Sequence, residues 1–92
     1  MALTKDERKA LELARERIAT SRAIFICWAL RDVGKEYRLP VARLKRYIAT
    51  RLDGSNALYG WQINHGLGDR GPEQRRKDRL AWIDWMLDQP EV

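Results

Sequence analysis

The residues that could carry chemistry are few in this chain, which has one histidine, His65, and one cysteine, Cys27. A zinc site draws about four ligands from Cys, His and carboxylate side chains, and the chain offers no typical set. A cysteine nucleophile needs an exposed thiol beside a base, whereas Cys27 lies inside an apolar run that we expect to be core. No pair of acids stands out as a catalytic dyad. We therefore expect no enzymatic activity, no bound metal and no cofactor.

A glycine pattern at residues 66–71, Gly-Leu-Gly-Asp-Arg-Gly, matches the string of dinucleotide-binding sites. Those sites need a strand before the glycines and a βαβ unit around them. No strand pattern precedes this one, so we interpret residues 65–72 as a loop. The helix start that follows could hold an anion through its free amides. Three arginines close to it are candidates for contacts with a partner: Arg70, Arg75 and Arg76.

Four tryptophans in 92 residues are many, and this side chain either fills cores or anchors interfaces. Trp28 lies in the apolar run, and Trp61 and Trp82 fall on apolar faces of expected helices, so we predict that all three are buried. Trp85 falls on the opposite side of its helix, near Asp88. It is the strongest candidate for an exposed anchor that binds a protein partner.

Length and composition indicate one globular domain, residues 1–92, with 45% apolar and 34% charged residues. The net charge of +5 favours nucleic acid, an anionic membrane or an acidic protein as partner, although such an excess is also common on soluble domains. The single cysteine fits a reducing compartment. No apolar signal core or membrane-length run is present. We expect a cytoplasmic monomer or homodimer without membrane contact.

Thr4 and Glu7 have the spacing of a capping box, which predicts the start of the first helix. The apolar face of that helix has three residues at helical spacing: Leu11, Ala14 and Ile18. Thr20 and Ser21 offer a break, with Ser21 as a candidate N-cap of the next helix, and a single helix bent at this point is the alternative.

Residues 23–30 are eight apolar residues without interruption. A helix that is apolar all round is expected at the centre of a bundle, with neighbours on several sides. A buried strand is the alternative for so short a run, but the alanines and the flanking residues favour a helix. We expect the helix to end near Gly34. Its large side chains are predicted to be mostly buried: Ile24, Phe25, Ile26, Trp28 and Leu30.

The next helix is expected to begin at Leu39-Pro40, because proline is tolerated in a first turn. Its apolar face consists of Val41, Leu44, Ile48 and Leu52. Its outward positions carry cations, and no acid occurs between residues 41 and 52. We call this set the basic face: Arg43, Lys45, Arg46 and Arg51.

Ser55 is a plausible cap for a short helix that contains Trp61, and a final helix is expected from Pro72 to about Asp88. The apolar face of the final helix consists of Leu80, Ile83 and Leu87, widened by Trp82 and Met86. No alternating pattern predicts a strand. The sequence therefore predicts an all-α fold, a compact bundle of four to five helices in a single domain.

Residues 48–61 resemble the helix-turn-helix motif of DNA-binding proteins, with a glycine turn and a serine cap between two helices. In that resemblance the basic face contacts phosphates, and three polar residues contact base edges: Asn56, Tyr59 and Gln62. The turn is about one residue shorter than in the motif, and Gly60 weakens the second helix.

The layout also resembles small uncharacterised helical proteins encoded by phages and prophages. The segments that carry this likeness are 25–30, 44–52, Trp61 and 79–85. The resemblance implies a non-enzymatic accessory protein that binds, and inhibits or redirects, a host or defence protein. This is our first functional hypothesis. A helix-turn-helix DNA-binding protein that uses residues 40–65 is the alternative.

Overall fold

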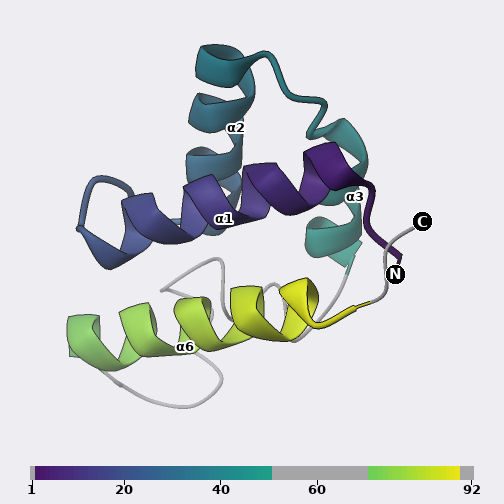
Figure 1. Ribbon diagram of the computed structural model, residues 1–92. Coiled ribbons are helices and arrows are strands. Elements are labelled where there is room, and N and C mark those ends of the chain that lie inside the picture. Colours follow the sequence, from purple (N-terminus) through teal and green to yellow (C-terminus); the bar gives the residue numbers. More distant parts are fainter. Residues whose placement is uncertain (1, 51–70, 90–92) are drawn as a thin grey trace.

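The computed structural model describes residues 2–50 and 71–89 (Figure 1). Within these two ranges the chain forms four helices and no strand: α1 Lys5–Ala19, α2 Ile26–Tyr37, α3 Ala42–Thr50 and α6 Gly71–Leu87. The predicted all-helical fold is confirmed for this part of the chain. The short helix expected after Ser55 lies outside the described residues, as do residues 65–70 of the loop expected at 65–72. The last two residues of that predicted loop, Gly71 and Pro72, belong to α6.

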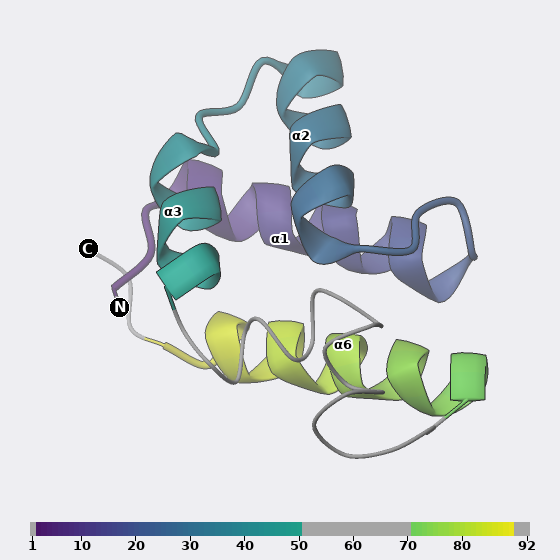
Figure 2. The same cartoon turned by 180° about the vertical axis from the view of Figure 1, so that it is seen from behind.

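Helix α1 is the central element of the described fold. Helices α1 and α6 lie side by side and run in opposite directions, while α2 crosses α1 and α3 returns beside α2 (Figures 1 and 2). Helix α1 packs against both α2 and α6. The prediction that the apolar run 23–30 forms the central helix is therefore wrong, because α2 meets the other described helices through one face.

The start and the buried face of α1 confirm the sequence pattern. The Glu7 amide donates to Thr4 Oγ1 at 3.1 Å, and the Thr4 amide donates to Glu7 Oε1 at 3.0 Å, which completes the capping box. The face toward α2 and α6 contains apolar side chains that are at most 1% exposed: Ala10, Leu11, Ala14 and Ile18. Full burial of one such leucine or isoleucine contributes roughly 1.5–3 kcal/mol.

The predicted break after α1 is confirmed, but the predicted N-cap is wrong. Ser21 has a left-handed φ of 61°, and the next helix starts only at Ile26. Its N-cap is Phe25, which makes no capping bond from its side chain. The amides of Arg22 and Ala23 donate to the Arg17 carbonyl, so the chain first folds back on the end of α1. Ser21 is used in that turn and is too early to cap α2.

Burial along residues 23–30 differs from the prediction. Ile26 and Leu30 are fully buried, whereas Ile24 is 61% and Trp28 47% exposed. Phe25 and Cys27 are partly buried. The buried face of α2 consists of Ile26, Ala29, Leu30 and Val33. Trp28 lies on the opposite side of the helix, so predicting it as core was wrong.

Helix α2 continues past Gly34, which was predicted to end it. A Cβ atom at Gly34 would lie 2.9 Å from Val41 Cγ2, so this glycine allows the chain before α3 to pack closely on α2. The helix ends where Arg38 adopts a left-handed conformation with φ 55° and its amide donates to the Gly34 carbonyl. Gly34 thus marks a close approach and not a helix terminus.

Helices α3 and α6 complete the core. Helix α3 begins at Ala42, slightly after the predicted Leu39-Pro40 start, and buries Leu44 and Ile48 fully. The bounds predicted for the last helix are confirmed within about one residue. Its buried face is shifted from the predicted one, because Leu80 and Leu87 are only partly buried. The buried residues of α6 are Arg79, Trp82, Ile83 and Met86.

Candidate functional site

The acids with shifted pKa values are held by arginines. A hydrogen bond from Arg43 lowers the pKa of Glu7, and one from Arg15 lowers the pKa of Asp84. A general acid or base works best with a pKa near the operating pH, so these shifts favour structural roles. Within residues 2–50 and 71–89, no group of three or more His, Cys, Asp and Glu side chains could hold a metal ion.

Arg43, the first arginine of the predicted basic face, forms contacts that hold the fold together. Arg43 donates from Nε to Glu7 Oε2 at 2.8 Å and from Nη2 to the Ala2 carbonyl at 2.9 Å. Glu7 is only 3% exposed, so this pair ties α3 to the first turn of α1. A guanidinium that neutralises a buried carboxylate offers little charge to a phosphate.

The structure describes three residues of the predicted DNA-binding set, and all three lie on α3: Arg43, Lys45 and Arg46. Lys45 is partly buried, and Arg46 is exposed on α3. The remaining predicted contacts lie outside the described residues: Arg51, Asn56, Tyr59 and Gln62.

Trp85, the predicted anchor, is 41% exposed, so the prediction of exposure is confirmed. Its ring centroid lies 6.2 Å from that of Trp82, which is buried beneath it at 7% exposure. Of the arginines predicted to accompany Trp85, Arg76 pairs with Glu73 at 2.8 Å. Arg75 lies within α6, and Arg70 lies outside the described residues. The binding role of these residues stays a prediction.

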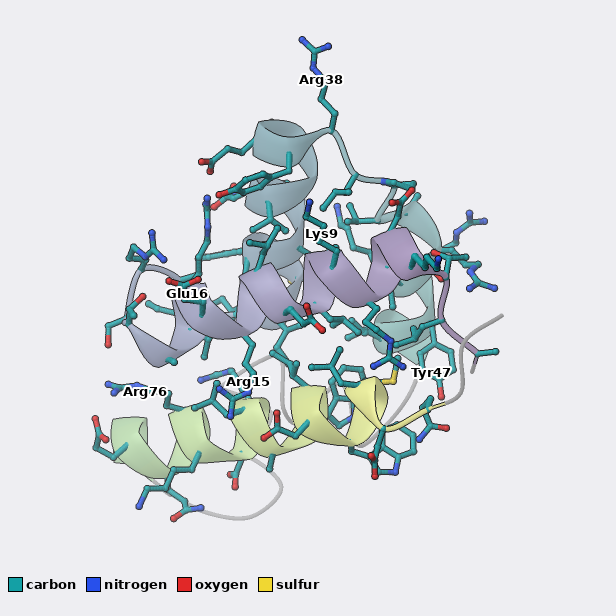
Figure 3. The ribbon with its side chains drawn as sticks, in the orientation of Figure 1. Lys9, Arg15, Glu16, Arg38, Tyr47 and Arg76 are labelled. Atoms are coloured by element: carbon teal, nitrogen blue, oxygen red, sulfur yellow. The ribbon has the colours of Figure 1, made fainter. Side chains whose placement is uncertain are left out.

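Polar contacts fix α6 on α1. The Arg15 guanidinium donates from Nε to Asp84 Oδ1 at 2.7 Å and from Nη2 to Oδ2 at 3.1 Å. Arg15 extends from α1 toward α6 (Figure 3). Nearer the N-terminus of α1, Arg8 donates to the carbonyls of Leu87 and Gln89 at the C-terminal end of α6. These bonds satisfy acceptors at the end of α6 that have no partner within the helix. Trp85 therefore lies on a helix whose position is fixed.

A second exposed apolar site lies at the start of α2, and sequence reasoning missed it. We call it the α2 surface: Ile24, Phe25 and Trp28. The Phe25 and Trp28 rings meet edge to face, with centroids 4.6 Å apart and planes at 90°. The Arg79 guanidinium carbon lies over the Phe25 ring, 5.2 Å from its centroid, so a residue of α6 packs against this ring. Ile24 precedes the first residue of α2, so helical spacing alone could not have grouped it with Trp28.

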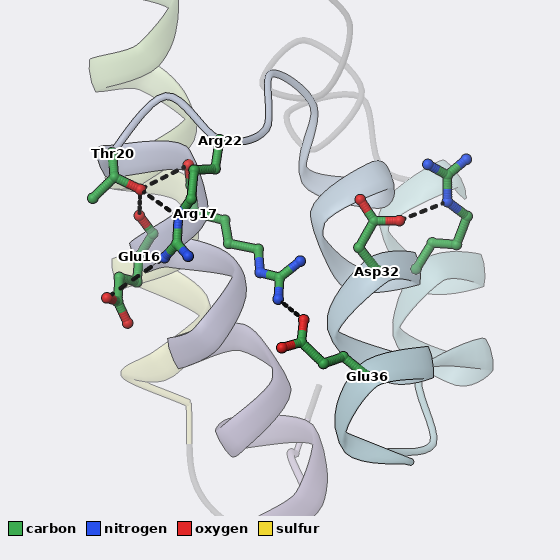
Figure 4. Close-up of polar contacts among 7 residues, drawn as sticks. Glu16, Arg17, Thr20, Arg22, Asp32 and Glu36 are labelled. Atoms are coloured by element: carbon green, nitrogen blue, oxygen red, sulfur yellow. Dashed lines mark hydrogen bonds and ion pairs between the residues drawn. The ribbon is translucent and has the colours of Figure 1, made fainter.

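Ion pairs hold the acids of α2 (Figure 4). Arg17 of α1 donates to Glu36, and this contact raises the pKa of Arg17. Arg31 donates to Asp32 at 3.1 Å. Within the described part of the chain, Lys35 and Arg38 are exposed and make no ion pair. Arg38 points away from the body of the molecule (Figure 3).

No described helix combines the length and the apolar character needed to cross a membrane. Compared with protein-family models, with curated proteins and with solved structures, the chain matches none of them.

Proposed function

We propose that this chain is a non-enzymatic protein that binds another protein through the α2 surface. One observation carries the proposal: Ile24, in the connection just before α2, is 61% exposed, and Trp28, in the first turn of α2, is 47% exposed. Burying large apolar side chains in a partner is favourable, and tryptophan is enriched among residues that dominate interfaces.

The support beneath Trp28 suits an interface anchor. The edge-to-face contact with Phe25 and the position of Arg79 limit the orientations of these rings before any partner arrives. A side chain that is ordered in advance loses less entropy on binding. Trp85 is the second anchor in this proposal, and Arg70, Arg75 and Arg76 are further candidate contacts with the partner.

In the cell, such a protein would act as a phage-type accessory factor that inhibits or redirects a host or defence protein by occupying its surface. DNA binding is less favoured, because Arg43 of the basic face is engaged by Glu7. Phosphate contacts supply most of the affinity for nucleic acid, so losing one of four predicted contacts weakens that hypothesis.

The test is an affinity capture from host lysate with and without nuclease, followed by affinity measurements with the purified partner. Trp28→Ala should weaken binding by about 2 kcal/mol, or roughly thirtyfold. Tyr37→Ala is the matched control, because Tyr37 is an equally exposed aromatic residue at the other end of α2. Equal binding by the wild type and Trp28→Ala would contradict the proposal. Loss of the captured partner after nuclease treatment would favour DNA.

A further inference from the structure

Cations extend the α2 surface along the solvent side of α2. Arg31, Lys35 and Arg38 follow Trp28 at three, seven and ten residues, and all are exposed. Spacings of three and four place Trp28, Arg31 and Lys35 on one helix face, and Arg38 continues it at the C-cap. An aromatic anchor is thus followed by a row of positive charge.

The acids of the same helix neutralise Arg31 but leave Lys35 and Arg38 without a partner among the described residues. Glu36 is paired with Arg17, and Asp32 with Arg31. Covering an unpaired cation with an apolar partner has a large desolvation cost, whereas an opposing carboxylate offsets that cost and guides docking.

We propose that the segment that docks on α2 is an acidic amphipathic segment of a protein. This inference rests on the proposed function and names the chemistry of the partner. Apolar side chains of the segment cover Ile24 and Trp28, and its carboxylates face Lys35 and Arg38. From Trp28 to Arg38 the row spans roughly 15 Å, so about three turns of a partner helix cover it.

Nucleic acid fits this surface less well. Ile24 is the most exposed of the large apolar side chains that the structure describes, and an aliphatic group neither stacks on a base nor reads its edge by hydrogen bonds.

The experiment uses two synthetic helical peptides of equal length, with Leu and Phe on one face and either Glu or Gln on the other. Binding to the full chain is measured by calorimetry at low salt, and the bound surface is mapped from backbone amide shifts. The Glu peptide should bind at least tenfold more tightly than the Gln peptide, with shifts centred on residues 24–38. This advantage should shrink at high salt, which screens exposed charges.

Two charge-matched variants locate the effect. Lys35→Gln with Arg38→Gln should reduce the affinity for the Glu peptide to that for the Gln peptide. Lys5→Gln with Lys9→Gln removes the same charge from the solvent face of α1, on which Lys9 lies (Figure 3), and should change little. If both variants lost the same affinity for the Glu peptide, net charge alone would explain the binding and the inference would be overturned.

The remaining outcomes separate this inference from the proposed function. Equal binding of both peptides, with loss of both in Trp28→Ala, would overturn the acidic partner and leave protein docking intact. No binding of either peptide would also overturn the inference, and capture of a protein that depends on Trp28 would still support the proposed function. A single-stranded oligonucleotide could displace the Glu peptide and shift the amide signals of residues 24–38. That result would identify nucleic acid as the ligand of this surface and would overturn the inference.

Discussion

Helix α1 and the segment 23–30 show opposite relations between composition and burial. More than half of the residues in α1 are charged. Five residues of this helix nevertheless form a continuous buried face: Glu7, Ala10, Leu11, Ala14 and Ile18. The segment 23–30 has no charged residue, yet it contains the two most exposed large apolar side chains in the described part, Ile24 and Trp28. Burial therefore depends on which face of a helix meets a neighbour, and the local density of apolar residues is a weaker guide.

The largest expected effect of a substitution is on the α1 side of this comparison. Leu11→Ala should lower the free energy of unfolding by about 2–5 kcal/mol, because Leu11 is fully buried and its truncation leaves a cavity. Urea denaturation measures this change. If Leu11→Ala lowered the free energy of unfolding less than Trp28→Ala does, the buried face of α1 would contribute less to stability than the exposed Trp28.

Glu7→Gln tests the buried charge that α1 holds. At neutral pH the substitution should cost about 2 kcal/mol, because the carboxylate accepts charge-assisted bonds from Arg43 and from the Thr4 amide. The pKa of Glu7 is lowered by folding, so its contribution is complete above about pH 4.3, the unfolded value, and is lost as pH falls through the lower folded pKa.

The stabilities of the wild type and Glu7→Gln should therefore converge as the pH falls below about 4. Denaturation midpoints between pH 7 and pH 3 check this convergence. Glu12→Gln, at an exposed position of the same helix, is the control and should follow the wild type at each pH. A constant difference between wild type and Glu7→Gln would mean that its charge contributes no stability.

Trp28→Ala is expected to have a smaller effect on folding. The lost edge-to-face contact with Phe25 should cost about 1 kcal/mol. A core tryptophan would cost about 3–5 kcal/mol on the same change. Thermal melting distinguishes these values. A loss of stability in the higher range would mean that Trp28 is part of the core.

Ile24→Ala should have the smallest effect, within about 0.5 kcal/mol of the wild type, since 61% of this residue is exposed. The same variant should bind the captured partner less tightly, because the apolar area offered at the α2 surface is reduced. Unchanged binding with unchanged stability would leave Ile24 without a role in the proposed interface.

The features that the sequence predicted well are local ones. The capping box joins residues three apart, and the buried face of α1 follows directly from helical spacing. The bounds of α6 and the exposure of Trp85 also follow from patterns within one segment. Such features depend on backbone geometry that each helix carries with it, so they need no knowledge of its neighbours.

The features that the sequence did not predict depend on contacts between distant segments. Arg43 meets Glu7 across 36 residues, and this contact turns a predicted phosphate ligand into a structural ion pair. Arg79 is buried because it stacks on Phe25, a residue of the α1–α2 connection. Gly34 allows a close approach whose partner, Val41, follows in the next connection. Trp28 is exposed because the described helices that pack on α2 meet its opposite face.

The bonds from Arg8 to the end of α6 have a consequence for the order of folding. Arg8 and Leu87 are 79 residues apart, so this contact closes a long loop and belongs to the slow, non-local class. During synthesis, the side of α1 that packs against α6 lacks this cover until α6 has left the ribosome. A nascent chain stalled before residue 71 should therefore present apolar surface to chaperones that the completed fold conceals.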